Sequence, residues 1–164
     1  MAILIRKAKV SDSKFLVSLA KELMDHNRQL ARNDKTRSEL LQLVGNVSSL
    51  WRRWALKCIK SPNSLVLVAE NGGEIVGYSL NFIKENVKVY KIKKVGHVSD
   101  LYVSKGYRNR GIATKFMKEA LKWFKKKGMK YLSIAVHAKN TNAHKIYKKW
   151  GFFDYHTEMR RRLG

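Results

Sequence analysis

Apolar residues recur in the first third of the chain with two different spacings, which predict a strand followed by two helices. Ile3 and Ile5 stand at alternate positions, as is typical of an edge or half-buried strand, and Ser11-Asp12 follows as a helix N-cap. From about Asp12 the apolar spacing becomes helical, and two consecutive helices broken near Asn33-Asp34 are expected. The two helical sets are Phe15, Leu16, Leu19, Leu23 and Met24, then Leu40, Leu41, Leu43, Val44, Val47, Leu50, Trp51, Trp54 and Ile59.

The middle of the chain has the pattern of three successive strands. Residues 65–69 form a continuous apolar run, which is typical of a buried strand, and the Asn-Gly-Gly turn at 71–73 leads back into a second strand at 75–80. A lysine-rich connection over 88–94 precedes a third strand at 97–103. These residues predict a hairpin extended by a further strand.

Helices and strands alternate in the last part of the chain. An amphipathic helix is expected from Gly111 to Gly128, then a strand over 131–136, and then a helix over 140–150 that ends at Gly151. The tail at 152–163 is expected to hold one or two short strands. The element order is βααβββαβαβ, which predicts a layered α/β fold with α+β character and a mixed sheet.

Composition favours one compact domain over residues 1–164. The chain has 45% hydrophobic residues and a single proline, so neither a linker nor a disordered tail is indicated. The lone Cys58 lies in an apolar stretch and is interpreted as a buried small residue, with no disulfide. Without a signal-type apolar start or a long apolar run, a cytoplasmic location is expected.

Charge is the one extreme of the composition. The 35 Lys and Arg residues outnumber the 12 Asp and Glu residues, giving a formal net charge of +23. Such a balance favours an anionic partner, which could be nucleic acid, a ribosome, a membrane surface or a phosphorylated cofactor. Background lysine enrichment is the alternative, and charge alone does not choose between them.

A basic turn between the strand at 97–103 and the following helix is the most informative segment. Unpaired N–H groups at a helix start attract anions, and Gly111 lets a phosphate approach the main chain. Gly106 and Gly111 have the spacing of a nucleotide P-loop, but Ile112-Ala113 replaces its Lys and Ser or Thr, which argues against ATP or GTP hydrolysis. A plain connection with solvated arginines is the alternative.

Two segments in this order resemble the signatures of the GCN5-related N-acetyltransferase (GNAT) family. Residues 108–113, Arg-Asn-Arg-Gly-Ile-Ala, resemble its Arg/Gln-x-x-Gly-x-Gly/Ala turn, and residues 140–152 resemble Asn-x-x-Ala-x-x-x-Tyr-x-x-x-Gly-Phe. The resemblance implies a central mixed sheet flanked by helices on both faces, and acetyl-CoA as co-substrate without a metal. The implied donor-binding residues are Leu101, Tyr102, Val103, Arg108, Asn109, Arg110, Gly111, Ile112, Ala113, Thr114, Asn140 and Tyr147.

The resemblance also implies direct transfer without an acyl-enzyme. A main-chain N–H at about Val103 would stabilise the charge on the thioester oxygen, and Tyr147 would protonate the departing thiolate. Ordinary pKa values make that proton transfer uphill by about 2 kcal/mol unless a basic environment, such as Lys148-Lys149, lowers the pKa of the phenol. Packing against the pantetheine arm is the alternative for Tyr147, and capping of its helix is the alternative for Asn140.

Asp100 and His97 are the candidates for the general base. Strand alternation places them on opposite faces, so that at most one points toward the acceptor unless a bulge intervenes. Asp100 is equally suited to bind the acceptor cation or an arginine, and His97 is more typical of a satisfied polar residue. The histidines have no metal-ligand spacing, and no metal is expected.

The acceptor is expected to be a protein N-terminal or lysine amine. An α-amine is about one-seventh neutral at pH 7 and a lysine amine far less, and a polyamine pocket would need carboxylates, for which Glu22, Asp25, Asp34, Glu39 and Glu85 are the reserve. Small-molecule acetylation, a nucleic-acid or ribosome-binding module that retains only CoA binding, and a homodimer are left as alternatives. In the nucleic-acid alternative, phosphates would be contacted by Lys88, Lys91, Lys93, Lys94 and Arg160 to Arg162.

Overall fold

The computed structural model describes residues 3–163, which form two compact units. The larger unit holds the described chain up to Met24 together with Val44–Ala135. The smaller unit holds Asp25–Leu43 and the described residues from Val136 onward. Each unit is described by itself.

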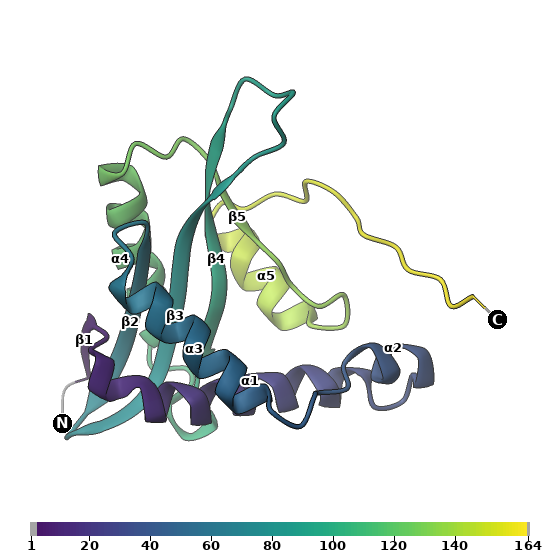
Figure 1. The fold of residues 1–164 in the computed structure, drawn as a ribbon, viewed down its shortest axis with the longest axis horizontal. Helices are drawn as coiled ribbons and strands as arrows, with labels where there is room; N and C mark the ends of the chain where they lie inside the picture. Colours follow the sequence, from purple (N-terminus) through teal and green to yellow (C-terminus); the bar gives the residue numbers. More distant parts are fainter. Residues whose placement is uncertain (1–2, 164) are drawn as a thin grey trace. The chain divides into compact units, whose positions relative to one another are not determined.

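A five-stranded mixed sheet forms the centre of the larger unit (Figure 1). Its strands are β1 (Leu4–Lys7), β2 (Ser64–Asn71), β3 (Glu74–Glu85), β4 (Lys94–Val103) and β5 (Leu132–Ile134), in that spatial order. The first four strands pair antiparallel, whereas β4 and β5 are parallel. The strands predicted at 3–5 and over 65–69, 75–80 and 97–103, and the hairpin at 71–73, are confirmed.

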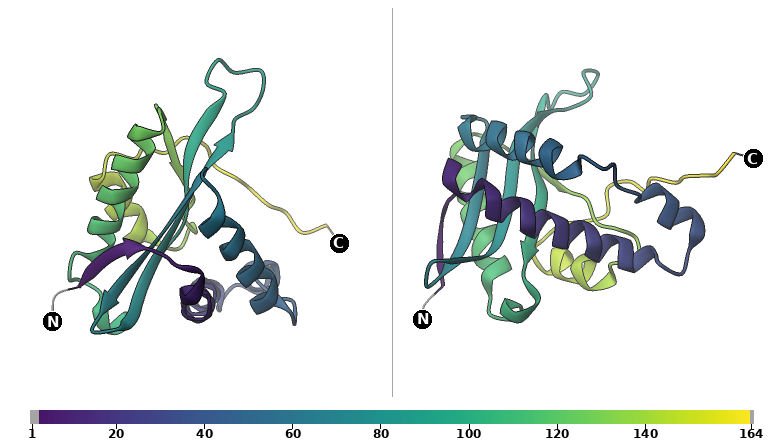
Figure 2. Two further views of the ribbon diagram at one scale, coloured as in Figure 1. Left: turned by 60° about the vertical axis from the view of Figure 1, so that its left-hand side comes forward. Right: turned by 60° about the horizontal axis from the view of Figure 1, so that its bottom comes forward.

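Helices cover both faces of this sheet, as expected (Figure 2). The Ser13–Met24 part of α1 (Ser13–Ala31) and α3 (Val47–Lys60) cover one face, and α4 (Ile112–Lys126) covers the other. The first face buries Leu16, Leu19, Cys58, Val66, Val68, Tyr78, Leu80 and Tyr102. The second buries Leu65, Leu67, Ala69, Val76, Val103, Ile112 and Phe116.

The structure divides the second predicted helical region into two helices. The Asp34 carboxylate accepts a hydrogen bond from the Arg37 backbone N–H and so caps α2 (Lys35–Leu40), while α1 ends at Ala31 as the expected break requires. The next helix, α3, begins only at Val47, after Gly45-Asn46. The expectation of one helix starting near Leu40 was wrong, because a side-chain cap and a glycine interrupted the apolar periodicity.

Two expectations for the C-terminal part are also corrected. The strand expected over 131–136 is confined to Leu132–Ile134, because its parallel pairing with β4 runs only along Gly96–Val98. Residues 152–163 contain no strand, although one or two were expected. Most of these residues are exposed, and the Arg160-Arg161-Arg162 run gives no apolar face that could be buried in a sheet.

A β-bulge in β4 changes which side chains share a face. Leu80 of β3 pairs with Asp100, whereas Asn81 pairs with Val98, so Ser99 is an extra residue on β4. Such a residue interrupts the two-residue alternation of a strand. The residues on either side of Ser99 are therefore not related by simple odd-even spacing.

Among residues 3–163, no helix is long and apolar enough to cross a membrane.

Candidate active site

At the end of β4, the main-chain N–H and C=O groups of two residues, Leu101 and Val103, point away from β3. The Ser104 N–H donates to the Val76 carbonyl over 2.9 Å, and Val103 is the residue paired with Gly77. Because hydrogen-bonded and non-hydrogen-bonded pairs alternate in an antiparallel ladder, Leu101 and Val103 direct their N–H and C=O groups to the opposite side. The β5 ladder runs from Gly96 to Val98, so these N–H groups lie beyond the part of β4 that β5 pairs with.

Gly77 allows β3 and β4 to approach closely at this point. A Cβ on Gly77 would lie 2.8 Å from the Tyr102 carbonyl oxygen and 3.3 Å from the Val103 Cα. Both neighbours are main-chain atoms, which cannot rotate away as a flexible side chain can. The position of the outward-facing N–H and C=O groups of Val103 therefore depends on a glycine in the neighbouring strand.

Residues 108–113 form a turn whose backbone is suited to binding an anion. Asn109 and Gly111 have positive φ values of 61° and 74°, and such left-handed positions bring successive N–H groups to one side. Gly111 is the N-cap of α4 and makes no side-chain cap bond, and the first helical bond runs from the Lys115 N–H to the Gly111 carbonyl. The N–H groups of residues 112–114 are left by the helix for another acceptor.

The two arginines of this turn each donate a hydrogen bond to a main-chain carbonyl. Arg108 Nε donates to the Val103 carbonyl over 2.9 Å, and its guanidinium carbon lies 5.4 Å from the Tyr102 ring centroid. Arg110 Nη2 donates to the Gly106 carbonyl over 3.1 Å. Both side chains remain exposed, and their positive charges lie beside the backbone of the turn.

Asp100 lies on the sheet face covered by α1 and α3, opposite the face covered by α4. Its carboxylate accepts hydrogen bonds from Tyr78 Oη at 2.9 Å and from Ser99 Oγ at 3.1 Å. Burial raises the pKa of Asp100, and the hydrogen bonds from Tyr78, Ser99 and Trp51 oppose that rise. A half-buried carboxylate with a raised pKa is a suitable proton acceptor near neutral pH.

His97 lies on the same face as Asp100, because the Ser99 bulge provides the exception to strand alternation. It pairs with Phe82, which packs against the core under α1 and α3, and its ring centroid lies 5.1 Å from that of Phe82. His97 Nδ1 is 2.8 Å from Ser133 Oγ. Burial, assisted by the Lys84 charge, lowers the pKa of His97 to about 4, so the imidazole is neutral at pH 7.

Sequence patterns did not indicate how Glu22 connects α1 to the end of β4. Glu22 Oε2 accepts a hydrogen bond from Tyr102 Oη at 3.0 Å and from Ser104 Oγ at 3.3 Å. Burial, followed by the hydrogen bond to Glu22, raises the pKa of Tyr102. The only sequence signal is that Glu22 stands between the apolar positions Leu19 and Leu23, at the border of the buried helix face.

The smaller unit contains the second signature segment, on α5 (Thr141–Lys149). Asn140 Oδ1 accepts a hydrogen bond from the Ala143 N–H at 3.1 Å, so the side chain caps the helix. The Tyr147 ring lies 5.7 Å from the Trp150 ring and 6.2 Å from the Phe152 ring, measured between centroids. Both signature residues are thus held within their own segment.

The surroundings of Tyr147 raise the pKa of its phenol. Burial is the cause, so the condition that Lys148-Lys149 lower this pKa is not met. Lys148 Nζ is instead paired with Asp154 Oδ2 at 2.7 Å, and His144 Nε2 lies 2.7 Å from the other oxygen of that carboxylate. The charge of Lys148 is therefore compensated locally. Across residues 3–163, the His, Cys, Asp and Glu side chains form no group that could hold a metal ion.

The chain belongs to the acetyltransferase (GNAT) family, whose sequence model matches residues 22–152. It is 29% identical over 106 residues to an uncharacterized N-acetyltransferase of Methanocaldococcus jannaschii, a match that covers 62% of this chain and 45% of the relative. It is 26% identical to the thialysine N-epsilon-acetyltransferase of Bos taurus, over 93% of this chain and 85% of the relative. An N-alpha-acetyltransferase of Sulfurisphaera tokodaii is 32% identical over 57% of this chain and 59% of the relative. The chain thus spans less than half the length of the first of these relatives.

Solved structures show the same fold at low sequence identity. A predicted acetyltransferase of Clostridium acetobutylicum, solved with acetyl-CoA, has a TM-score of 0.78 at 17% identity, over 99% of this chain and 97% of the other. An aminoglycoside N-acetyltransferase in complex with CoA has a TM-score of 0.76 at 16% identity, over 99% and 95% of the two chains. These likenesses confirm the predicted fold.

Proposed function

We propose that the protein transfers the acetyl group of acetyl-CoA to a primary amine by direct attack of that amine on the thioester. The observation that carries the proposal is the pair of outward-facing N–H groups at Leu101 and Val103, which precede the anion-binding turn at 108–113. Family membership and the two solved structures that hold acetyl-CoA or CoA support the same donor.

The donor would be held mainly by main-chain groups. The pyrophosphate would accept hydrogen bonds from the N–H groups of the turn and of the first residues of α4, aided by the helix dipole. Arg108 and Arg110 would add positive charge without being the principal ligands, because each already donates to a main-chain carbonyl. The resemblance of residues 140–152 to the second family signature supports a contact of Asn140 with the pantetheine arm.

The acetyl carbonyl would be polarised by an N–H of β4. As the amine nitrogen bonds to the carbonyl carbon, the negative charge on the oxygen would be stabilised by Val103 or Leu101, and the C–S bond would then break. Tyr147 would give its proton to the CoA thiolate. Because burial raises the pKa of Tyr147, that transfer is more uphill than about 2 kcal/mol and would follow C–S cleavage rather than drive it.

Asp100 would take the proton that the amine loses. His97 is less suited to this role, since its pKa of about 4 makes it a weak base and Ser133 occupies its Nδ1. The raised pKa of Asp100 brings a carboxylate closer to the working pH, which improves a general base. Binding of the incoming ammonium is a second use of the same charge.

The acceptor class is proposed to be a protein amine. The related proteins are named for different amines, an α-amine for the Sulfurisphaera tokodaii relative and a thialysine ε-amine for the Bos taurus relative. A carboxylate base suits an α-amine best, because that group is partly neutral at pH 7.

The buried thiol of Cys58 fits the proposed cytoplasmic location, where free cysteines persist.

An acceptor screen with purified protein tests the proposed activity. Acetyl-CoA is incubated with peptides bearing a free N-terminus, N-terminally blocked lysine peptides, a polyamine and an aminoglycoside, and acetylation is measured by mass shift with thiol release. We expect the free N-terminal peptides to react fastest. Calorimetric titration with CoA is run in parallel, and absence of CoA binding at saturating concentration would contradict the proposed donor.

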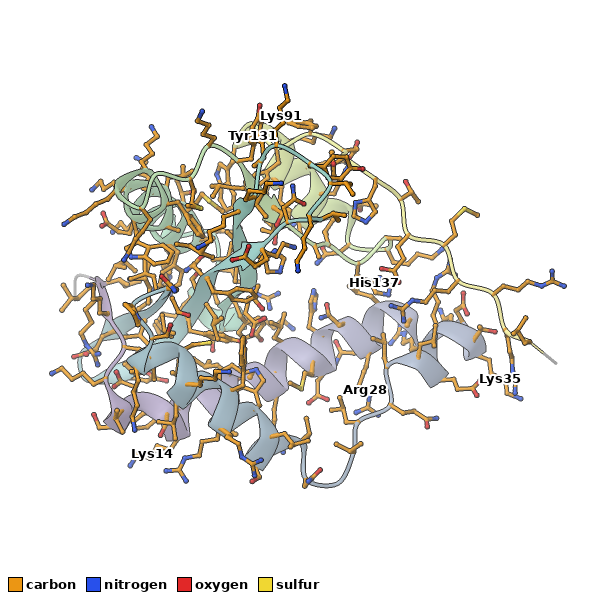
Figure 3. The ribbon with its side chains drawn as sticks, turned by 45° about the horizontal axis from the view of Figure 1, so that its top comes forward. Lys14, Arg28, Lys35, Lys91, Tyr131 and His137 are labelled. Carbon is orange, nitrogen blue, oxygen red and sulfur yellow. The ribbon has the colours of Figure 1, made fainter. Side chains whose placement is uncertain are left out.

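A second candidate function is nucleic-acid binding through the connection between β3 and β4. This connection projects beyond the rest of the sheet, and Lys91 points away from the strands at its end (Figures 1 and 3). Tyr90 is 53% exposed there and is flanked by Lys88, Lys91 and Lys93, an arrangement that suits phosphates and a stacked base. Fluorescence anisotropy with single-stranded RNA at two salt concentrations tests it. Undetectable binding at low salt would eliminate this candidate.

A further inference from the structure

A chain of contacts joins α1 to the donor-binding turn through the side chain of Tyr102. Glu22 of α1 accepts the hydrogen bond of Tyr102 Oη at 3.0 Å, and the Tyr102 ring carries the Arg108 guanidinium at 5.4 Å. Tyr102 itself is only 8% exposed, so its ring has little freedom to shift between these two neighbours.

Arg108 extends the chain to the main chain of β4. Its Nε donates to the Val103 carbonyl over 2.9 Å, and both the N–H and the C=O of Val103 face away from β3. Arg108 is also the first residue of the turn at 108–113. One side chain thus clamps the end of β4 to the start of the anion-binding turn, and its place is set by the ring beneath it.

Ser104 strengthens the connection by a second route. Its Oγ donates to the same Glu22 Oε2 at 3.3 Å, while its N–H donates to Val76 of β3 at 2.9 Å. Glu22 therefore fixes two residues of the segment that leads from β4 into the turn. Hydrogen bonds to a charged acceptor are among the stronger ones that proteins form.

We infer that Glu22 is a positioning residue for acetyl-CoA, acting through Tyr102 and Arg108 although it stands on a helix that contributes no backbone to the turn. This inference rests on the proposed function. Loss of the Glu22 carboxylate removes the hydrogen-bond acceptor of Tyr102 Oη and of Ser104 Oγ, which weakens the support of Arg108 and of its bond to Val103. Donor affinity falls as a result, and the chemical step, once the donor is bound, is nearly unchanged.

Steady-state kinetics with four variants test the inference. Glu22→Ala and Tyr102→Phe each raise the KM for acetyl-CoA about 3- to 10-fold with kcat within about 2-fold, because Glu22→Ala removes both hydrogen bonds to the carboxylate and Tyr102→Phe removes one of them. Glu22→Gln retains an oxygen acceptor and stays close to wild type. The double variant Glu22→Ala/Tyr102→Phe is no worse than Glu22→Ala alone, as a shared pathway requires.

Controls separate the positioning role from a general loss of stability and from an effect on acceptor binding. Glu119→Ala removes an exposed carboxylate that pairs with Lys122 on α4, and it leaves the KM for acetyl-CoA unchanged. Thermal unfolding shows that each variant is folded, and calorimetry gives the Kd for CoA directly. An unchanged Kd in Glu22→Ala overturns the inference, as does a rise confined to the KM of the acceptor. Failure of the wild-type protein to bind CoA contradicts the proposed function instead.

Discussion

The two sides of β4 build their chemistry from different parts of the chain. The side turned away from β3 offers main-chain N–H groups at Leu101 and Val103, which lead into an exposed turn. The face under α1 and α3 offers the side chains of Asp100 and His97, both half-buried and both hydrogen-bonded. The contribution of Leu101 and Val103 should depend on backbone geometry rather than on their side chains, whereas the contribution of Asp100 should depend on its side chain.

The largest effect is expected from Gly77→Val, which changes only the space beside the main chain of β4. Its Cβ would lie 2.8 Å from the Tyr102 carbonyl oxygen, so β3 and β4 must separate where Val103 faces outward. We expect kcat/KM for acetyl-CoA to fall about 100-fold or more, and the free energy of unfolding to fall by about 1–3 kcal/mol from overpacking. Steady-state kinetics and urea unfolding measure the two losses.

Gly45→Val is the matched control for this substitution. A Cβ at Gly45 meets no atom within 4 Å, so neither kinetics nor stability should change beyond the effect of a surface substitution. If Gly77→Val instead retained the wild-type kcat/KM, the donor would not depend on the geometry of the Val103 peptide. The contrast between the two sides of β4 would then be lost.

A slightly smaller effect is expected from Asp100→Asn on the opposite face. The amide keeps an oxygen for the Tyr78 hydroxyl but accepts no proton. We therefore expect kcat/KM for the acceptor to fall about 100-fold, the lower end of the usual contribution of a general base. Wild-type activity should fall as pH is lowered through the pKa of Asp100, which burial moves above its ordinary range. The variant should lack this acid limb, which is measured as a pH profile of kcat/KM.

Ser99→Ala serves as a control for Asp100→Asn. It removes the 3.1 Å hydrogen bond to Asp100 Oδ1 and leaves the carboxylate in place. The acid limb should shift to slightly higher pH, because a hydrogen bond that lowers the pKa of Asp100 is gone. An Asp100→Asn variant with the wild-type pH profile would assign the proton to another acceptor.

Gly111→Ala should produce a moderate loss that is confined to donor binding. Gly111 has a φ of +74° at the N-cap of α4, a conformation that costs a residue with a Cβ about 1 kcal/mol. We expect the KM for acetyl-CoA to rise about 5-fold, in line with that strain, with kcat nearly unchanged. Gly106→Ala is the comparison, because a Cβ there meets nothing within 4 Å and should leave the KM as it is. Equal effects of both substitutions would point to general loosening of the loop.

The main-chain region could be predicted from the sequence better than the side-chain region. A strand, a basic turn with Gly111 and an amphipathic helix are encoded by local spacing, and the structure places all three as expected. The Ser99 bulge was not predictable, because it arises from the pairing of β4 with β3 and no residue type requires it. For that reason the faces of His97 and Asp100 could not be assigned from alternation alone.

Long-range contacts account for the remaining differences. The bonds from Tyr102 and Ser104 to Glu22 join positions 80 and 82 residues apart, and no local pattern indicates such a pair. The sequence left the direction of the pKa shift of Tyr147 open, and burial, which no local pattern indicates there, raises that pKa. The roles of Tyr147 and Asn140 in catalysis and donor binding stay predictions.

The smallest effect on activity is expected from His97→Gln, which tests whether every side chain on the face under α1 and α3 matters. His97 should be replaceable at pH 7 with less than about a 2-fold change in kcat/KM, because a neutral imidazole bonded to Ser133 makes no contribution as a base. Stability should nevertheless respond to pH. The folded protein keeps His97 neutral down to about pH 4, whereas the unfolded chain protonates it near 6.5, so the free energy of unfolding falls as pH drops between these values. Urea unfolding at pH 7.5 and 4.5 should show a loss of about 2 kcal/mol in the wild type that is smaller in the variant. A large kinetic defect at pH 7 would instead make His97 part of the chemistry and widen the side-chain site beyond Asp100.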